Sequence, residues 1–194
     1  QRGEGSYNRV IEAAKMARLE GITVEFLTVL TKDNLDHIDF ILDKAKELGC
    51  SNVFQPVTKY CLSGDITDSV IPSPDTMRKT INYLIERKKD SKINNSYTAL
   101  NYYLNWPNKK RIKCWAGKLF FALSDEGFIE PCCAITLSDS TKCTDKGFGH
   151  AFANITSFDC NGCWIAANID FNLIFSLNRE AFSNMFRFLN LRKK

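Results

Sequence analysis

The stretch KCWAGKLFFALSDEGFIEPCC, residues 113–133, decides how this chain is interpreted. Its apolar run KLFFAL predicts a β-strand, and the following SDEG has the composition of a turn whose glycine takes a positive φ. The residues FIEP then predict a returning strand. The result is a β-hairpin with one thiol at each base, Cys114 and Cys132.

A second pair of thiols lies at Cys160 and Cys163, in the sequence CNGC. Two sulfurs at Cys-x-x-Cys spacing reach a single centre, as they do in zinc and iron–sulfur sites. Four thiolates from two separate segments are soft ligands that favour zinc or an iron–sulfur cluster. We therefore expect Cys114 and Cys132 to join this pair at one metal site.

Composition limits the class of protein. The 194 residues are 44% hydrophobic and 25% charged, which is typical of a globular chain that buries a core. The net charge of +4 is modest, and the short basic runs lack interleaved aromatic residues, so we expect no nucleic-acid partner. No apolar run is long enough to span a bilayer and no signal peptide is present, so we expect a cytoplasmic protein with no membrane partner.

Eight cysteines are many for a chain of this length, and we expect them to be reduced and partly metal-binding rather than disulfide-bonded. The choice of ligands leaves two alternatives open. Cys133 adjoins Cys132 and points to the opposite side if the strand continues. Cys143 is either a substitute ligand or a plain thiol in a loop, whereas Cys50 and Cys61 are interpreted as plain thiols.

The first half of the chain alternates helix and strand. Apolar spacing predicts a helix over residues 6–19 with Ser6 as its N-cap, and another over residues 34–48 that ends at Gly49. Runs of β-branched and aromatic residues predict buried strands at residues 22–30 and 52–57. This alternation is typical of a parallel α/β sheet. Two strands leave edges unpaired, which indicates part of a larger sheet or barrel.

The second half is less regular. A helix capped by Ser73 and a short helix over residues 96–104 precede Asn-Trp-Pro-Asn at 105–108, which interrupts the pattern. We place a domain boundary there, dividing the chain into residues 1–105 and 106–194. After the hairpin we expect an irregular loop over residues 138–150. A closing helix over residues 178–191 follows, with one apolar face turned to the core.

The cysteine pattern resembles a known family. Cys114, Gly127, Cys132 and the late Cys160-x-x-Cys163 are similar to the auxiliary iron–sulfur module of radical S-adenosylmethionine (radical SAM) enzymes, called the SPASM or twitch domain. Upstream, RGEGSY, TVLTKDN and QPV resemble the later β/α units of the partial barrel of these enzymes. The resemblance implies an α/β fold: the last β/α units of a partial (β/α) barrel, followed by a small α+β cysteine-rich twitch/SPASM-like domain.

The resemblance also implies a cofactor and its role. One auxiliary 4Fe-4S cluster would be held by Cys114, Cys132, Cys160 and Cys163, for electron transfer or substrate positioning in S-adenosylmethionine-dependent radical chemistry. S-adenosylmethionine belongs to the complete enzyme, because the Cys-x-x-x-Cys-x-x-Cys motif that cleaves it is absent from this sequence. We therefore expect a fragment that is not catalytic alone and assign no catalytic residue. Its expected partners are the missing N-terminal barrel portion and the substrate, a peptide or small metabolite.

A different class of function stays open. A hairpin thiol pair with a Cys-x-x-Cys pair also describes a structural zinc site with four cysteine ligands. Under that interpretation the protein is a non-catalytic zinc-binding or scaffold module.

Overall fold

The structure is a computed structural model that describes residues 3–58, 68–108, 112–135, 137, 139–156 and 162–191, with only the backbone for residues 68 and 187–191. Cys61 and Cys160 lie outside these residues. In the described ranges no helix is both long and apolar enough to cross a membrane. In chain order the elements are α1 (Ser6–Leu19), β1 (Glu25–Leu30), η1 (Leu35–His37), α2 (Ile38–Glu47), β2 (Ser51–Pro56), η2 (Asp68–Val70), α3 (Pro74–Arg87), α4 (Tyr97–Tyr103), β3 (Ala122–Leu123), β4 (Phe128–Glu130), β5 (Thr141–Lys142), α5 (Cys143–Lys146), α6 (Phe148–Ala153), α7 (Ala166–Phe175) and α8 (Arg179–Leu191).

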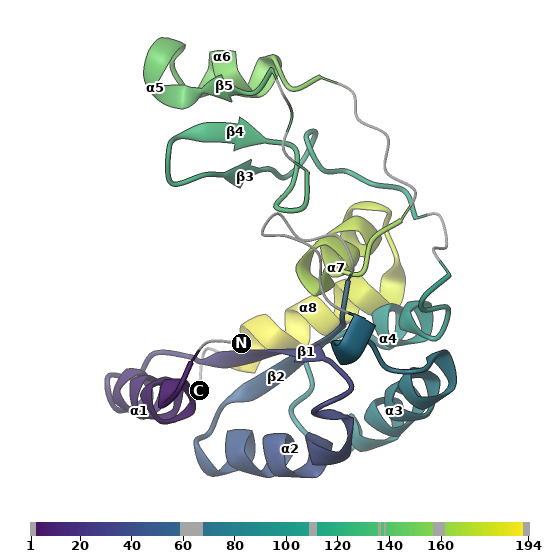
Figure 1. The fold of residues 1–194 in the computed structure, drawn as a ribbon. Helices are drawn as coiled ribbons and strands as arrows, with labels where there is room; N and C mark the ends of the chain where they lie inside the picture. The colour runs from purple at the N-terminus through teal and green to yellow at the C-terminus, as the bar shows by residue number, and fades with distance from the viewer. Residues whose placement is uncertain are drawn as a thin grey trace.

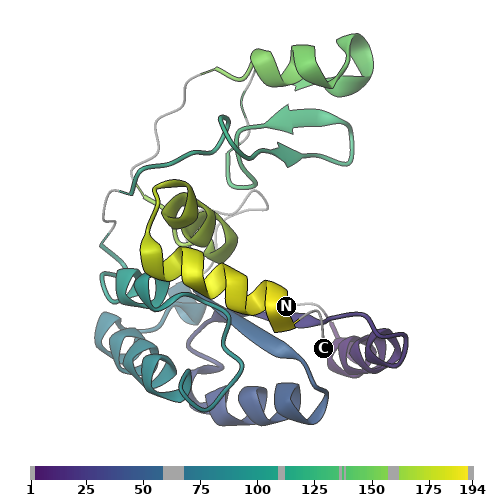
Figure 2. The ribbon, with the colours of Figure 1, turned by 180° about the vertical axis from the view of Figure 1, so that it is seen from behind.

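The fold is mixed α/β with a small parallel sheet. Strands β1 and β2 run parallel, in a register that pairs Glu25 with Ser51 and Leu30 with Pro56. A single bridge between Asn52 and Ile93 extends the far edge of β2. Figures 1 and 2 show α2 on one face of this sheet and α7 with α8 on the other. The parallel α/β arrangement predicted for the first half is therefore confirmed.

The core forms where the helices meet β2. Phe54 is fully buried at the centre of that strand, and it packs in one cluster with apolar residues of α2, α3, α4 and α7. The fully buried side chains of this cluster are Leu30, Phe54, Met77, Ile81, Leu84, Ala99, Leu100, Tyr103 and Ile169. Because residues of α7 join residues of α3 and α4 here, the C-terminal helices belong to the same core as the first half.

The hairpin region stands apart from these layers. Strands β3, β4 and β5 form an antiparallel sheet in that order, and α5 and α6 lie beside it. Figures 1 and 2 show this group extending away from the parallel sheet. Gly127 makes the predicted turn with φ of 88°. The division of the chain at residue 106 stays a prediction, since α7 and α8 return to pack against β2 and α4.

Two predicted helix N-caps are confirmed and the starts of the first two helices differ. The helix expected from residue 34 begins as η1 at Leu35, becomes α-helical only at Ile38, and has no side-chain cap from Asn34. The hydroxyls of Ser73 and Ser96 accept hydrogen bonds from the backbone N–H of Thr76 and Ala99, and so cap α3 and α4. Ser6 is not a cap: Gly5, with φ of 72°, precedes α1, and Ser6 is its first helical residue.

Several longer-range expectations were wrong. The strand expected at residues 22–30 begins at Glu25 and is not wholly buried. Leu27 is 60% exposed because it faces an open pocket between β1 and the helices α7 and α8. The loop expected at residues 138–150 contains β5 and α5 and the start of α6, and α7 forms where no element was predicted. On α8, Phe182 and Phe186 are 42% and 48% exposed, so they contact each other at the surface rather than filling the core.

A glycine holds the turn between α2 and β2. Gly49 has φ of 68°, and a Cβ added there would lie 3.4 Å from Nη2 of Arg18. We expect Gly49→Ala to lower the free energy of unfolding by about 1 to 2 kcal/mol, the usual cost of a left-handed non-glycine residue. Urea unfolding measures this. Gly149→Ala is the matched control, because Gly149 lies in α6 with no atom near its added Cβ. Equal losses of stability in the two variants would contradict the conclusion that the positive φ at position 49 requires glycine.

Candidate functional site

Helix α7 positions the first of the predicted ligands, Cys114. The side-chain amide of Asn172, fully buried in the second turn of α7, donates to Cys114 Sγ over 3.7 Å. The oxygen of the same amide accepts from the backbone N–H of Trp115 at 2.8 Å. Trp115 in turn donates from Nε1 to Ser176 Oγ at 3.1 Å. The segment that carries the Cys114 thiol is therefore hydrogen-bonded to the second half of α7 and to Ser176 at its end.

Cys163 lies just before the same helix. Its Sγ accepts a hydrogen bond from the backbone N–H of Ile165 at 3.4 Å, and its side chain packs against the main core. The adjacent Trp164 is buried, and its ring contacts Tyr102 and Tyr103 at centroid distances of 5.3 and 6.4 Å. N–H groups that donate to sulfur stabilise a thiolate and are among the features that tune iron–sulfur clusters.

Cys132 lies at the base of the hairpin, as predicted. It is buried and forms an antiparallel bridge with Ile135, whereas the adjacent Cys133 is exposed. Cys143 lies at the other end of the hairpin, where its backbone N–H donates to Gly127 O at 2.9 Å. The choice of Cys132 over its neighbour as a ligand stays a prediction.

The three described thiols do not by themselves form a closed metal site. Within the described ranges, which omit Cys160, no group of three or more His, Cys, Asp or Glu side chains is close enough to hold a metal ion. The chemistry of the donor set fits an iron–sulfur cluster or zinc, since all four predicted ligands are thiols and two of them already accept N–H bonds. The convergence of the four sulfurs stays a prediction.

Sequence reasoning missed the polar residues that organise this region. Asn172 lies four residues after the buried Asn168 in α7, a spacing that places two amides on one helix face. This four-residue spacing was the signal in the sequence that could have identified the two amides. Glu130, at the end of β4, is also buried, and its carboxylate accepts from Leu137 N at 3.0 Å and Ser140 Oγ at 2.6 Å.

Two carboxylates hold the N-terminus of α4. Asp170 of α7 accepts from Ser96 Oγ at 2.6 Å, and Glu180 of α8 accepts from the backbone N–H groups of Tyr97 and Thr98 at 3.0 and 2.9 Å. Burial raises the pKa of Asp170 from 3.8 to about 6, although the hydrogen bonds from Ser96 oppose that rise. The negative charge of Glu180 adds to it.

The comparisons with known proteins concern the fold. No family model matches the chain, and no curated protein matches it. Among solved structures, the chain is similar to one described as "Native anSMEcpe with bound AdoMet", with a TM-score of 0.57 and 14% sequence identity. The likeness covers 97% of this chain and 62% of that chain. The two share a fold over almost all of this chain, and this chain spans less than two thirds of the other.

We expect Asn172→Leu to lower the free energy of unfolding by about 1 to 3 kcal/mol, because the backbone N–H of Trp115 loses its acceptor in a partly buried place. Leucine keeps the volume of the side chain, so the loss reports the hydrogen bonds rather than a cavity. Urea unfolding monitored by tryptophan fluorescence measures it. Asn101→Leu, at an exposed position of α4, is the matched control and should change little. Equal effects of the two substitutions would refute the role of Asn172.

The raised pKa of Asp170 predicts a pH-dependent stability. Its folded pKa of about 6 lies above an unfolded value near 3.9, so between these values the folded state binds more protons than the unfolded state. Asp170 therefore lowers the free energy of unfolding as the pH rises from about 4 to about 6, by up to about 3 kcal/mol.

Urea unfolding at several pH values between 4 and 7 tests this prediction. Asp170→Asn resembles the protonated acid, so it should remove this part of the pH dependence and stabilise the protein most at pH 7. Asp90→Asn, at an exposed position after α3, should leave the profile as in the unsubstituted protein. If the profiles of the unsubstituted protein and Asp170→Asn run parallel, Asp170 does not titrate in this range.

Proposed function

We propose that this chain is the C-terminal part of a radical SAM protein and that Cys114, Cys132, Cys160 and Cys163 hold one auxiliary 4Fe-4S cluster. In this proposal the parallel α/β layers are the last β/α units of a partial barrel. The hairpin region with the Cys-x-x-Cys pair is a twitch-like domain. The complete protein would act on S-adenosylmethionine through a separate cluster that this sequence does not provide.

The observation that carries the proposal is the attachment of two predicted ligands to one helix. Cys114 and Cys163 are far apart in sequence, yet both sulfurs accept N–H hydrogen bonds at α7, from the Asn172 side chain and from Ile165. Such bonds suit thiolates better than neutral thiols, because an ionised acceptor forms the stronger hydrogen bond. The shared fold with a solved chain that contains bound AdoMet also supports the proposal.

The residues of the chain have definite roles in this proposal. Asn172 and the N–H of Ile165 stabilise negative charge on the sulfurs, and burial of Cys132 at the hairpin base limits access of water to its thiol. A bound 4Fe-4S cluster supplies electron transfer or a means of positioning the substrate. The substrate would be a peptide or a small metabolite bound by the complete protein.

Anaerobic reconstitution with iron and sulfide tests the proposal. We expect a brown protein with about four irons and four sulfides per chain, detected by its visible spectrum and by metal analysis. Cys114→Ala and Cys163→Ala should each lose most of the iron. Cys50→Ala is the matched control and should retain it, because Cys50 is buried beside α1 and α2, away from α7.

The structural zinc module is the second candidate, and the same experiment separates the two. A colourless protein that holds about one zinc ion through these cysteines would refute the iron–sulfur assignment. A protein that binds neither metal would refute both candidates.

A further inference from the structure

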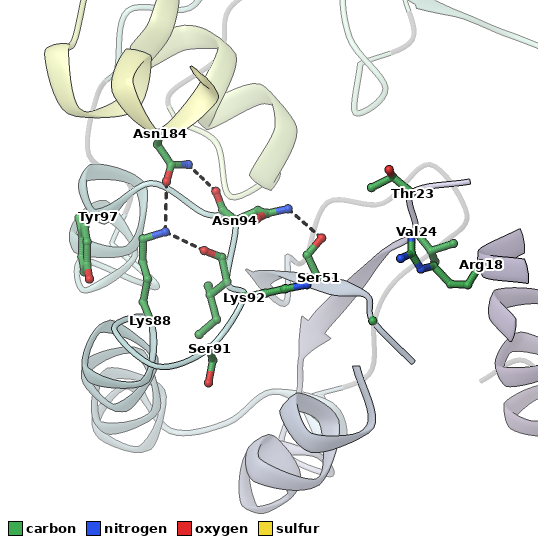
Figure 3. Close-up of a pocket in the computed structure, with 12 residues that line it drawn as sticks. Arg18, Thr23, Val24, Ser51, Lys88, Ser91, Lys92, Asn94, Tyr97 and Asn184 are labelled. Carbon is green, nitrogen blue, oxygen red and sulfur yellow. Dashed lines mark hydrogen bonds between the residues drawn. The ribbon is translucent and has the colours of Figure 1, made fainter. Parts of the chain in front are cut away.

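A polar cavity of about 270 Å³ opens at the amino ends of β1 and β2 (Figure 3). Its walls come from the end of α1, the residues that lead into both strands, the loop between α3 and α4, and α8. This volume is at the small end of ligand-binding pockets, which hold roughly 300 to 1,000 Å³. Because α7 meets the sheet near Gln55, toward the other end of β2, the cavity is distinct from the cysteine region.

The lining of the cavity is positively charged. Arg18, Lys88 and Lys92 contribute side chains to it, and none of the described residues that line it is acidic. Carboxylates lie behind the walls: Glu25 accepts hydrogen bonds from Asn94 Nδ2 and Ser51 Oγ, Asp170 interacts electrostatically with Lys88, and Asp90 lies near Lys92 on the far side of the loop. The surface that faces the cavity therefore carries three cations and no carboxylate among the described residues, which favours an anionic ligand.

The guanidinium of Arg18 is fixed at one side of the cavity. Its Nη1 donates to the backbone oxygen of Ile22 at 3.1 Å. Its other nitrogens pass directly over Gly49, where an added Cβ would lie 3.4 Å from Nη2. Arg18 is thus held by the turn that leads into β1, and it lies beside the turn that leads into β2.

Lys88 is fixed at the opposite side, as Figure 3 shows. Its Nζ donates to Ile93 O at 2.7 Å and to Asn184 Oδ1 at 3.2 Å, and it lies 5.2 Å from the centre of the Tyr97 ring. These contacts order the side chain before any ligand arrives. A positive charge that is already ordered loses little conformational entropy on binding an anion.

The positive charges of Arg18 and Lys92 both act on the thiol of Cys50, which lies beside the cavity. Burial raises the pKa of the Cys50 thiol, and the positive charges of Arg18 and Lys92 both oppose that rise. Both cations therefore lie near Cys50, although one comes from α1 and the other from the loop after α3. The two cations thus stand on two different walls of the cavity and are close enough to act on one thiol beside it.

We propose that this cavity binds a small phosphate-bearing anion. A phosphate group has three or more acceptor oxygens and up to two negative charges, so it uses donors that approach from several directions. Here the donors are guanidinium, ammonium, hydroxyl and amide groups from α1, β2, α3 and the loop after it. A carboxylate, with two oxygens in one plane, would leave part of these donors unused. The site does not depend on iron or zinc at the cysteines.

Isothermal titration calorimetry of the 194-residue chain with inorganic pyrophosphate at low ionic strength tests the proposal. We expect saturable binding of one pyrophosphate that weakens as salt is added. Arg18→Gln and Lys92→Gln should each raise the dissociation constant about tenfold, which corresponds to the loss of one charge-assisted hydrogen bond. Lys89→Gln, an exposed neighbour that does not line the cavity, is the matched control and should change it less than twofold.

Malonate, titrated at the same ionic strength, is the second arm, and we expect it to bind at least tenfold more weakly than pyrophosphate. Equal affinity for malonate would overturn the assignment of a phosphate ligand. The proposed site would be refuted if pyrophosphate did not bind in the millimolar range. It would also be refuted if Lys92→Gln and Lys89→Gln changed the dissociation constant equally. The midpoint of thermal unfolding, measured without ligand, shows whether each variant is folded. If Lys92→Gln is not folded, Lys92→Glu is used in its place to test the same side of the cavity.

Discussion

The structure depends on the need of buried polar groups for hydrogen-bond partners, and helix α7 is where this need is concentrated. The first N–H of α7, at Ala166, donates to the side chain of Gln55 in β2. Asp170 accepts from Ser96 at the start of α4, and Asn172 binds the backbone beside Cys114. An unpaired buried polar group costs about 1 to 3 kcal/mol, so each of these bonds restricts where α7 can lie.

This arrangement explains how a short helix connects three parts of the chain. The apolar side of α7 places Ile169 in the core with Phe54 and Leu100. The backbone N–H of Ala166 binds the sheet, and the side chains of Asp170 and Asn172 bind α4 and the segment before the hairpin. The hairpin region itself makes few other contacts with the parallel layers, and Figure 1 shows it extending from them. The segment of Cys114 is thus positioned by α7, through the amide of Asn172, the bond from Trp115 to Ser176 and the contact of the Phe120 ring with Phe171 and Phe175.

The two proposed sites lie toward opposite ends of the parallel strands. Trp106 donates to Val57 O just beyond β2, and it shares a cluster with Trp164, so Cys163 lies near the carboxyl end. The cationic cavity lies at the amino end, around Ser51 and Gly49. Loops at the two ends of a sheet are built by different connections, which allows one scaffold to carry a thiol region and an anion pocket separately.

The sequence by itself determined the features that depend on near neighbours. The helix–strand alternation, the caps at Ser73 and Ser96, and the turn glycines Gly49 and Gly127 all follow from preferences that act within a few residues. The sequence also identified the cysteine pattern, because the spacing between cysteines can be read directly from the order of the residues. Only the tertiary structure decided that α7 forms and docks, and that Phe182 stays exposed. These outcomes rest on contacts such as the one between Gln55 and Ala166, which are 111 residues apart, and a local pattern carries no information on partners at that distance.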